Sequence, residues 1–243
     1  MVYESCYWKD DLRSYATELK GVSTCNTQED EYREYRLEKA LLLSAFTVRL
    51  LLDSNKLSDG FDSRNLKVDF YSAKKDAQKN ISPFDKRFID ERYFALANPT
   101  SSSISLRQLT NQLIHSAVVV AFSYDNANRA LGFFVVSDND YEKRLCYCSL
   151  KEWVSVVEAV ADDDVIYALI HKDPKTGKCI TVKLAASDLL DIDATLSRLK
   201  SKGLSPEILD AICKNLTRMA TEESARPDSA ADLNDMTPES LDA

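Results

Sequence analysis

Residues 40–52 read ALLLSAFTVRLLL, and this apolar segment is expected to form the centre of the fold. A helix that is apolar on nearly every face is normally buried on all sides. Just upstream, residues 27–30 (TQED) resemble a capping box, in which a hydroxyl residue precedes an acidic residue by three positions. We therefore predict a long core helix over about 28–55, with Leu42 and Phe46 in its buried part.

Outside this helix the hydrophobic period alternates between that of strands and that of helices, which indicates both kinds of element in one chain. Strands are expected over about 66–71, 118–122, 131–136, 144–149, 165–171 and 179–184. Further helices are expected over about 11–20, 104–116, 150–161, 187–203 and 205–220. Gly21 should end the first of these helices, and Ser149 should begin the third with a capping box to Glu152. Residues 98–103 (NPTSSS) are expected to form a loop.

These elements predict an α+β fold class: a mostly antiparallel sheet of five or six strands packed against the long buried helix. A C-terminal helical hairpin and a disordered acidic tail complete the chain. We expect three parts, namely an α+β domain over 1–185, the helical hairpin over 186–220 and the tail over 221–243.

The charge of the chain is concentrated at its C-terminal end. The 243 residues carry a formal net charge of −8. Residues 221–243 hold seven acidic residues and one arginine, or −6, which leaves −2 for the remainder. This composition is typical of a disordered segment. Elsewhere no strongly basic stripe stands out, although binding of duplex nucleic acid generally needs one.

The six cysteines are scattered along a chain long enough to bury a core without disulfides. The N-terminal residues lack the apolar core of a signal peptide, and no run approaches the ~20 apolar residues of a membrane span. We therefore expect a cytoplasmic protein with free thiols and no membrane contact. Cys146 and Cys148 should share one face of a strand, and Cys25, Cys179 and Cys213 should be buried structural thiols.

The chain has only two histidines, and one of them, His115, lies in the helix predicted over about 104–116. Arg107, Asn111 and His115 are spaced by four residues, so they should form a polar stripe on an otherwise apolar helix. An imidazole can accept a proton from a ribose hydroxyl, while a guanidinium and an amide stabilise phosphate charge. The alternative, which we favour, is that Asn111 and His115 are buried polar groups bonded to the backbone at a helix-to-strand corner.

The stripe resembles the motif of HEPN-type RNase domains, in which an arginine, a polar residue, three further residues and a histidine line the active site. Asn111 and His115 match the last two elements, but Thr110 stands where the arginine is expected and Arg107 lies three residues too early. HEPN domains are also helical bundles, whereas strand patterns dominate here after residue 117. The resemblance implies metal-independent RNA cleavage, or descent from a domain with that activity.

Arg49 interrupts the apolar half of the long helix, and a guanidinium placed there needs a partner. Asp53, one turn further on, is the nearest acidic residue. We favour a structural ion pair between the two. The alternative is that Arg49 points into the same pocket as Asn111 and His115 and supplies the missing cation.

Familiar catalytic motifs are absent from the sequence. It contains no Walker loop, no G-x-G-x-x-G, no H-E-x-x-H, no G-x-S-x-G and no paired C-x-x-C, and five glycines leave little scope for a phosphate-binding loop. We expect no cofactor and no metal. The favoured hypothesis is a non-catalytic interaction or regulatory protein with an unidentified protein partner. The alternative is an HEPN-like endoribonuclease or RNA-processing domain that uses His115, Asn111 and Arg107 as catalytic residues on RNA.

Overall fold

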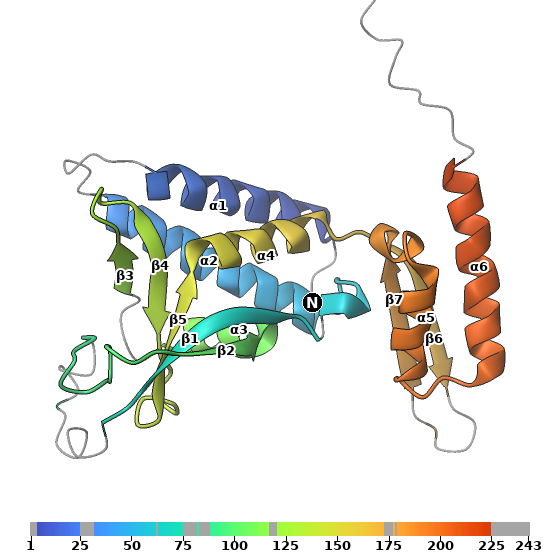
Figure 1. Ribbon diagram of the computed structural model, residues 1–243. Helices are drawn as coiled ribbons and strands as arrows, with labels where there is room; N and C mark the ends of the chain where they lie inside the picture. The colour runs from blue at the N-terminus through green and yellow to red at the C-terminus, as the bar shows by residue number, and fades with distance from the viewer. Residues whose placement is uncertain are drawn as a thin grey trace, which may run out of the picture. The chain divides into compact units, whose positions relative to one another are not determined.

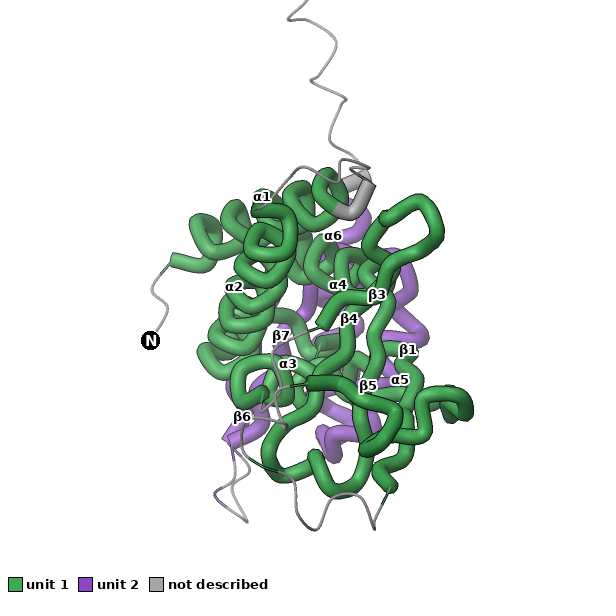
Figure 2. Tube along the Cα trace, turned by 90° about the vertical axis from the view of Figure 1, so that its left-hand side faces the viewer, with its two compact units in different colours: residues 1–165 green, residues 166–243 purple. Residues whose placement is uncertain are grey.

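The computed structural model describes residues 4–24, 32–61, 63–74, 82, 88–116, 121–172, 177 and 179–224. The chain divides into two compact units, residues 1–165 and residues 166–243 (Figure 2). The division falls about twenty residues before the boundary expected at 185/186, so the last two strands belong with the C-terminal helices.

The first unit is built on a five-stranded antiparallel sheet with the strand order β2-β1-β5-β4-β3 (Figure 1). Its strands are β1 (Asn65–Ser72), β2 (Thr100–Ser105), β3 (Ala121–Tyr124), β4 (Ala130–Val135) and β5 (Arg144–Ser149). The predicted α+β fold class is thereby confirmed. Residues 100–103, expected to be a loop, instead belong to the edge strand β2. This strand is formed by backbone pairing with β1, which a serine-rich sequence does not predict.

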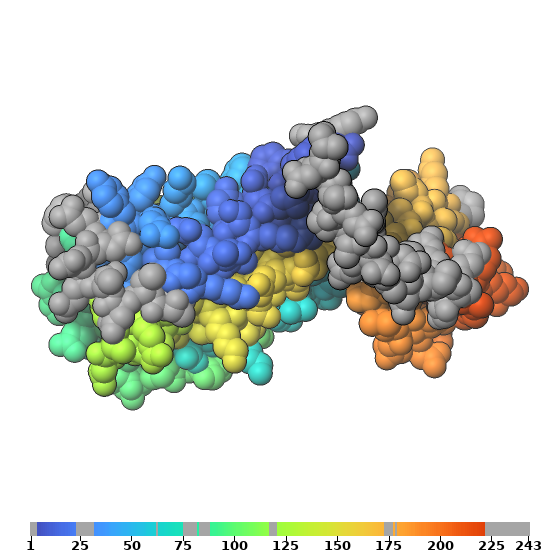
Figure 3. Space-filling view, turned by 90° about the horizontal axis from the view of Figure 1, so that it is seen from above, coloured from blue at the N-terminus to red at the C-terminus, as the bar shows by residue number. Residues whose placement is uncertain are grey.

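Helices cover one face of this sheet and enclose the main core. They are α1 (Cys6–Thr24), α2 (Arg33–Asp53), α3 (Leu106–Ile114) and α4 (Leu150–Asp162). In the space-filling view, α1 lies between α2 and α4 (Figure 3). Trp153 of α4 is fully buried, and its indole N–H donates to Ser44 of α2 over 3.1 Å. The opposite face of the sheet carries a smaller cluster, in which Phe94 and Tyr141 meet edge to face.

The structure corrects the predicted end of the first helix and confirms the predicted start at Ser149. α1 continues through Gly21 to Thr24, because a helix tolerates an internal glycine where packing holds the rest. α2 begins at Arg33, and the capping box expected at residues 27–30 lies outside the described residues. Ser149 does begin α4, accepting from the Glu152 N–H over 3.1 Å, but the Glu152 carboxylate accepts from the Lys67 N–H instead of returning to Ser149.

The long helix is not buried on all sides, which corrects the central sequence prediction. Leu41, Ala45 and Val48 of α2 are fully buried, but Phe46 is 50% exposed and Leu43 is 37% exposed. α2 lies in the outer helical layer, where α1, α3 and α4 cover only part of its circumference. Apolar composition on every face therefore did not imply burial on every face.

The second unit consists of a two-stranded sheet and a helix pair. Its elements are β6 (Val165–Lys172), β7 (Cys179–Ala185), the 3-10 turn η3 (Ala186–Leu189), α5 (Ile192–Lys200) and α6 (Pro206–Ser224). Val182, Leu199 and Ile212 are among the buried residues of its own core. The predicted helical hairpin is thus present. α6 includes residues 221–224, which were assigned to the tail, and the remainder of that tail lies outside the described residues.

Paired substitutions in α2 test this view of the long helix. Leu41→Ala should lower the free energy of unfolding by about 2–5 kcal/mol, because it empties a fully buried site. Phe46→Ala should cost about 1 kcal/mol or less, because half of that side chain already contacts solvent. Urea unfolding of both variants measures the difference, and equal losses would mean that a further surface covers Phe46.

Candidate functional site

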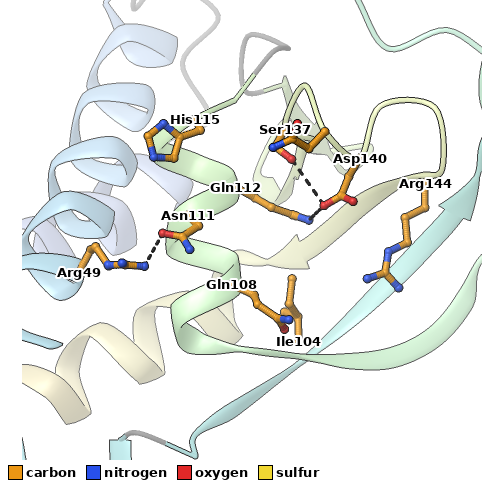
Figure 4. A pocket seen from close by; sticks show the side chains of 10 residues that line it. Arg49, Ile104, Gln108, Asn111, Gln112, His115, Ser137, Asp140 and Arg144 are labelled. Carbon is orange, nitrogen blue, oxygen red and sulfur yellow. Dashed lines mark hydrogen bonds between the residues drawn. The ribbon is translucent and has the colours of Figure 1, made fainter. Parts of the chain in front are cut away.

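A polar stripe runs along α3, directly after the edge strand β2. Gln108, Asn111, Gln112 and His115 are spaced i, i+3, i+4 and i+7, so they share one face of the helix and its C-terminal end (Figure 4). The opposite face buries apolar residues such as Leu109 and Leu113 in the main core. α3 is therefore amphipathic, and its polar face lines a cavity.

The start of α3 is fixed by a capping box that the sequence analysis missed. The Ser105 hydroxyl accepts from the Gln108 N–H over 3.2 Å, and the Gln108 carboxamide oxygen accepts from the Ser105 hydroxyl and N–H. Ser105 is the N-cap of α3, whereas the sequence predicted a helix that starts at about Ile104. This box sets the rotation of α3 and orients the Gln108 side chain.

Arg49 of α2 joins the stripe from the neighbouring helix. Its Nε donates to the Asp53 carboxylate over 2.6 Å, and its Nη1 donates to the Asn111 carboxamide oxygen. Asp53 also accepts from Arg107 of α3, so one carboxylate holds two guanidinium groups. Arg49 thus forms the expected ion pair with Asp53 and also lines the cavity beside Asn111 and His115, so both interpretations of Arg49 describe part of its surroundings.

The segment between β4 and β5 forms the other side of the cavity. The Asp140 carboxylate accepts from Gln112 Nε2 over 3.1 Å and from Lys143 Nζ over 3.1 Å. A bridge between Ser116 and Ser137 ties this segment to the end of α3. Burial alone would raise the pKa of Asp140, but the hydrogen bonds from Lys143 and Gln112 outweigh it and hold the pKa below its usual value. Asp140 is therefore an ionised carboxylate whose acceptors are already in use.

Arg144, the first residue of β5, also borders the cavity. Its guanidinium lies over the Phe70 ring, 3.8 Å from the ring centroid. Within the described part of the chain, no residue accepts a hydrogen bond from that guanidinium. The stacking contact fixes the position of the cation while leaving its N–H donors available.

The resulting cleft has a volume of about 480 Å³, within the range of about 300–1,000 Å³ typical of small-molecule sites. Its ten lining residues come from α2, the end of β2, α3 and the segment from Ser137 to Arg144. Two arginines, one histidine and four carboxamides face a single carboxylate, Asp140. The cleft therefore offers an excess of hydrogen-bond donors and positive charge.

The predicted site residues are only partly brought together. Asn111 and His115 line the cleft with Arg49, whereas Arg107 does not, because it turns to Asp53. The favoured structural interpretation was also inaccurate. His115 is exposed rather than buried, and Asn111 bonds to the Arg49 side chain rather than to backbone. In the described residues no hydrogen bond fixes the His115 imidazole, although its backbone N–H donates to the Asn111 carbonyl oxygen and ends α3.

Sequence reasoning missed seven further lining residues, among them Gln108, Gln112, Asp140 and Arg144. Gln108 and Gln112 could have been found, because they follow the helical spacing of Asn111 and His115. Asp140 and Arg144 carry no local signal, since strand pairing alone brings them beside α3.

None of the described cysteines lines the cleft. Cys146 and Cys148 are buried on one face of β5, as expected, and burial raises the pKa of Cys146 to about 12. The five described cysteines are free; Cys179 is exposed and Cys213 half-buried, contrary to expectation, and Cys25 lies outside the described residues. Among the described residues, no cluster of His, Cys, Asp and Glu is suited to hold a metal ion, and no helix is long and apolar enough to cross a membrane.

Comparisons with known proteins add no relative to this description. A scan against protein-family models, a search of curated proteins and a search of solved structures each found no match. The geometry of the cleft is therefore the basis for the functional argument.

The carboxylate that holds Arg49 and Arg107 should make stability depend on pH. Burial acts to raise the pKa of Asp53, but hydrogen bonds from Arg49 and Arg107 prevail and lower it. A carboxyl group with a lowered folded pKa stabilises the fold above its unfolded pKa of about 4, and this contribution is lost as pH falls through the folded pKa. Asp53→Asn should therefore be less stable than wild type near pH 7, and the gap should narrow below about pH 4. Urea melts across this pH series measure the gap, and a gap that stays constant would contradict the ion-pair account.

Proposed function

We propose that the protein is a non-catalytic interaction or regulatory protein whose first unit recognises an anionic ligand in the cleft between α2, α3 and the β4–β5 segment. One observation carries this proposal: Arg49 and Arg144 line the same cavity with donors that are not fully used. Arg144 donates to no described residue, and Arg49 keeps its Nη2 after bonding Asp53 and Asn111. Guanidinium groups with free, fixed donors are well suited to carboxylate and phosphate groups.

The surroundings of the two arginines favour an anion over a cation. The single carboxylate of the lining, Asp140, already accepts from Gln112 and Lys143. The remaining polar groups of the lining are carboxamides, a hydroxyl and an imidazole, none of which attracts a cation strongly. A bound anion would therefore gain charge-assisted hydrogen bonds without displacing a protein carboxylate.

The arrangement around His115 supports binding more than catalysis. A general base is normally oriented by a hydrogen bond from a second group. No such bond is found for the His115 imidazole among the described residues, and Arg49 is held by Asp53 and Asn111. In this proposal His115 is one more donor at the end of the cleft.

A protein partner remains part of the proposal, and exposed apolar side chains of the first unit indicate where it binds. The apolar stripe of α6, including Ile212 and Leu216, is used by the core of its own unit. On α2, in contrast to that buried stripe, Tyr35, Leu43 and Phe46 are exposed. They provide a contact surface on the first unit.

Titration with inorganic phosphate tests the anion site. Wild type should bind saturably in isothermal titration calorimetry, and Arg144→Gln should weaken binding about tenfold or more, because it removes a charge-assisted hydrogen bond. Arg129→Gln is the matched control, since Arg129 is an exposed arginine paired with Asp125 in the β3–β4 turn, away from the cleft lining. Absence of binding, or an equal loss in the control, would refute the anion site.

A second candidate, metal-independent RNA cleavage, is favoured by one observation: His115, Asn111 and Arg49 line one solvent-open cleft. Our proposal expects no cleavage of single-stranded RNA in EDTA by wild type or His115→Gln, and little change in the urea melt, because His115 is exposed. His171→Gln serves as control, since His171 belongs to the other unit. Cleavage by wild type and by the control that is lost in His115→Gln, with an unchanged melt, would establish the enzyme instead.

A further inference from the structure

We infer that the ligand of the cleft is a small phosphorylated polyol, such as a sugar phosphate, with its phosphate at Arg144 and its hydroxyl groups along the polar face of α3. This inference rests on the proposed anion site and specifies what that site binds. It is drawn from the way three carboxamides of the lining, those of Gln108, Asn111 and Gln112, are already oriented by the protein.

The phosphate position follows from the partners of the two arginines. Arg49 shares its charge with Asp53, whereas the Arg144 guanidinium is fixed against Phe70 without a hydrogen-bond acceptor among the described residues. Figure 4 shows Arg49 and Arg144 on opposite sides of the cleft, with Gln108, Asn111 and Gln112 between them. A ligand anchored at Arg144 therefore extends across the carboxamides toward Arg49.

Each of these carboxamides has one end occupied and the other end left for a ligand. The Gln108 oxygen is used by the capping box with Ser105, which leaves its amide nitrogen as a donor. The Asn111 oxygen accepts from Arg49, which likewise leaves a donor. Gln112 is the reverse: its nitrogen donates to Asp140, and its oxygen is the free end.

The Gln112 oxygen is the strongest indication of a missing ligand. Gln112 is only 6% exposed, and Oε1 is a buried acceptor without a hydrogen-bond partner in the described structure. Buried acceptors in native proteins are nearly always satisfied. Because the bond to Asp140 fixes the orientation of the amide, the partner must be a donor, and a hydroxyl group is a donor that can also accept from Gln108 and Asn111.

The lining argues for a small hydrophilic ligand rather than a nucleobase or an RNA strand. Ile104 is its one purely hydrocarbon side chain, and it includes no aromatic ring other than the His115 imidazole, whereas single-stranded nucleic acids are usually held by aromatic stacking. Residues 1–165 contain 21 basic and 26 acidic residues, a net charge of −5, so the unit has no overall attraction for a polyanion. The positive charge is local to the cleft.

Calorimetry with four probes tests the inference: inorganic phosphate, ribose, ribose 5-phosphate and a short single-stranded oligoribonucleotide. Ribose 5-phosphate should bind at least tenfold more tightly than phosphate or ribose, and more tightly than the oligonucleotide. Gln112→Met, of similar length but without the amide, should weaken ribose 5-phosphate by a larger factor than phosphate, because the amide contacts only the hydroxyl groups of the ligand. Arg144→Gln should weaken both ligands.

Asn215→Leu, in α6 of the other unit, is the matched carboxamide control and should change nothing. If Gln112→Met fails to fold, Gln108→Met provides the same test at an exposed position. Phosphate binding with no gain for ribose 5-phosphate would overturn the inference and leave the anion site standing. If neither phosphate nor ribose 5-phosphate binds, both the inference and the proposed anion site are overturned. Tighter binding of the oligonucleotide would replace the sugar phosphate by an RNA strand as the ligand.

Discussion

The contact between Arg49 of α2 and Asn111 of α3 is the interaction on which the cleft depends. Through Arg49, the Asp53 carboxylate and the Asn111 carboxamide become one network, and Arg107 closes it from the other end of α3. The apolar faces of the two helices already pack in the main core. The polar network adds direction to that packing, because it sets which residues of α3 face the cavity and turns Arg107 away from it.

The second wall of the cleft depends on strand pairing. β5 lies between β1 and β4, so that its first residue, Arg144, stands beside Phe70, and the preceding segment brings Asp140 to Gln112. Asp53 and Asp140 orient the residues of the cleft through hydrogen bonds. Arg144 and the unoccupied ends of the carboxamides remain available to bind a ligand. Recognition by such a site requires no proton transfer, and this is why we propose binding rather than catalysis.

The sequence predicted the parts of the structure that depend on local patterns. The strand over 66–71, the helix begun by Ser149 and the C-terminal helix pair all follow from period and capping. Sequence reasoning failed where contacts with distant parts of the chain determine the structure. Whether the face of α2 that carries Phe46 is covered depends on neighbouring helices, and the strand at residues 100–105 depends on pairing with β1. In the cleft, Asn111 and His115 were found from helical spacing, while Asp140 and Arg144 had no signal because they reach the site only through the sheet.

The central claim is that Arg144 and Arg49 together face an anion in one cleft. The most direct measurement is NMR of the arginine Nε–Hε groups during titration with inorganic phosphate, with the two signals assigned from Arg144→Lys and Arg49→Lys spectra. We expect both signals to shift saturably with a common dissociation constant, the Arg144 signal by more, since its donors are free. Unmoved signals at both arginines, or a gradual shift of all arginines with ionic strength, would contradict the account.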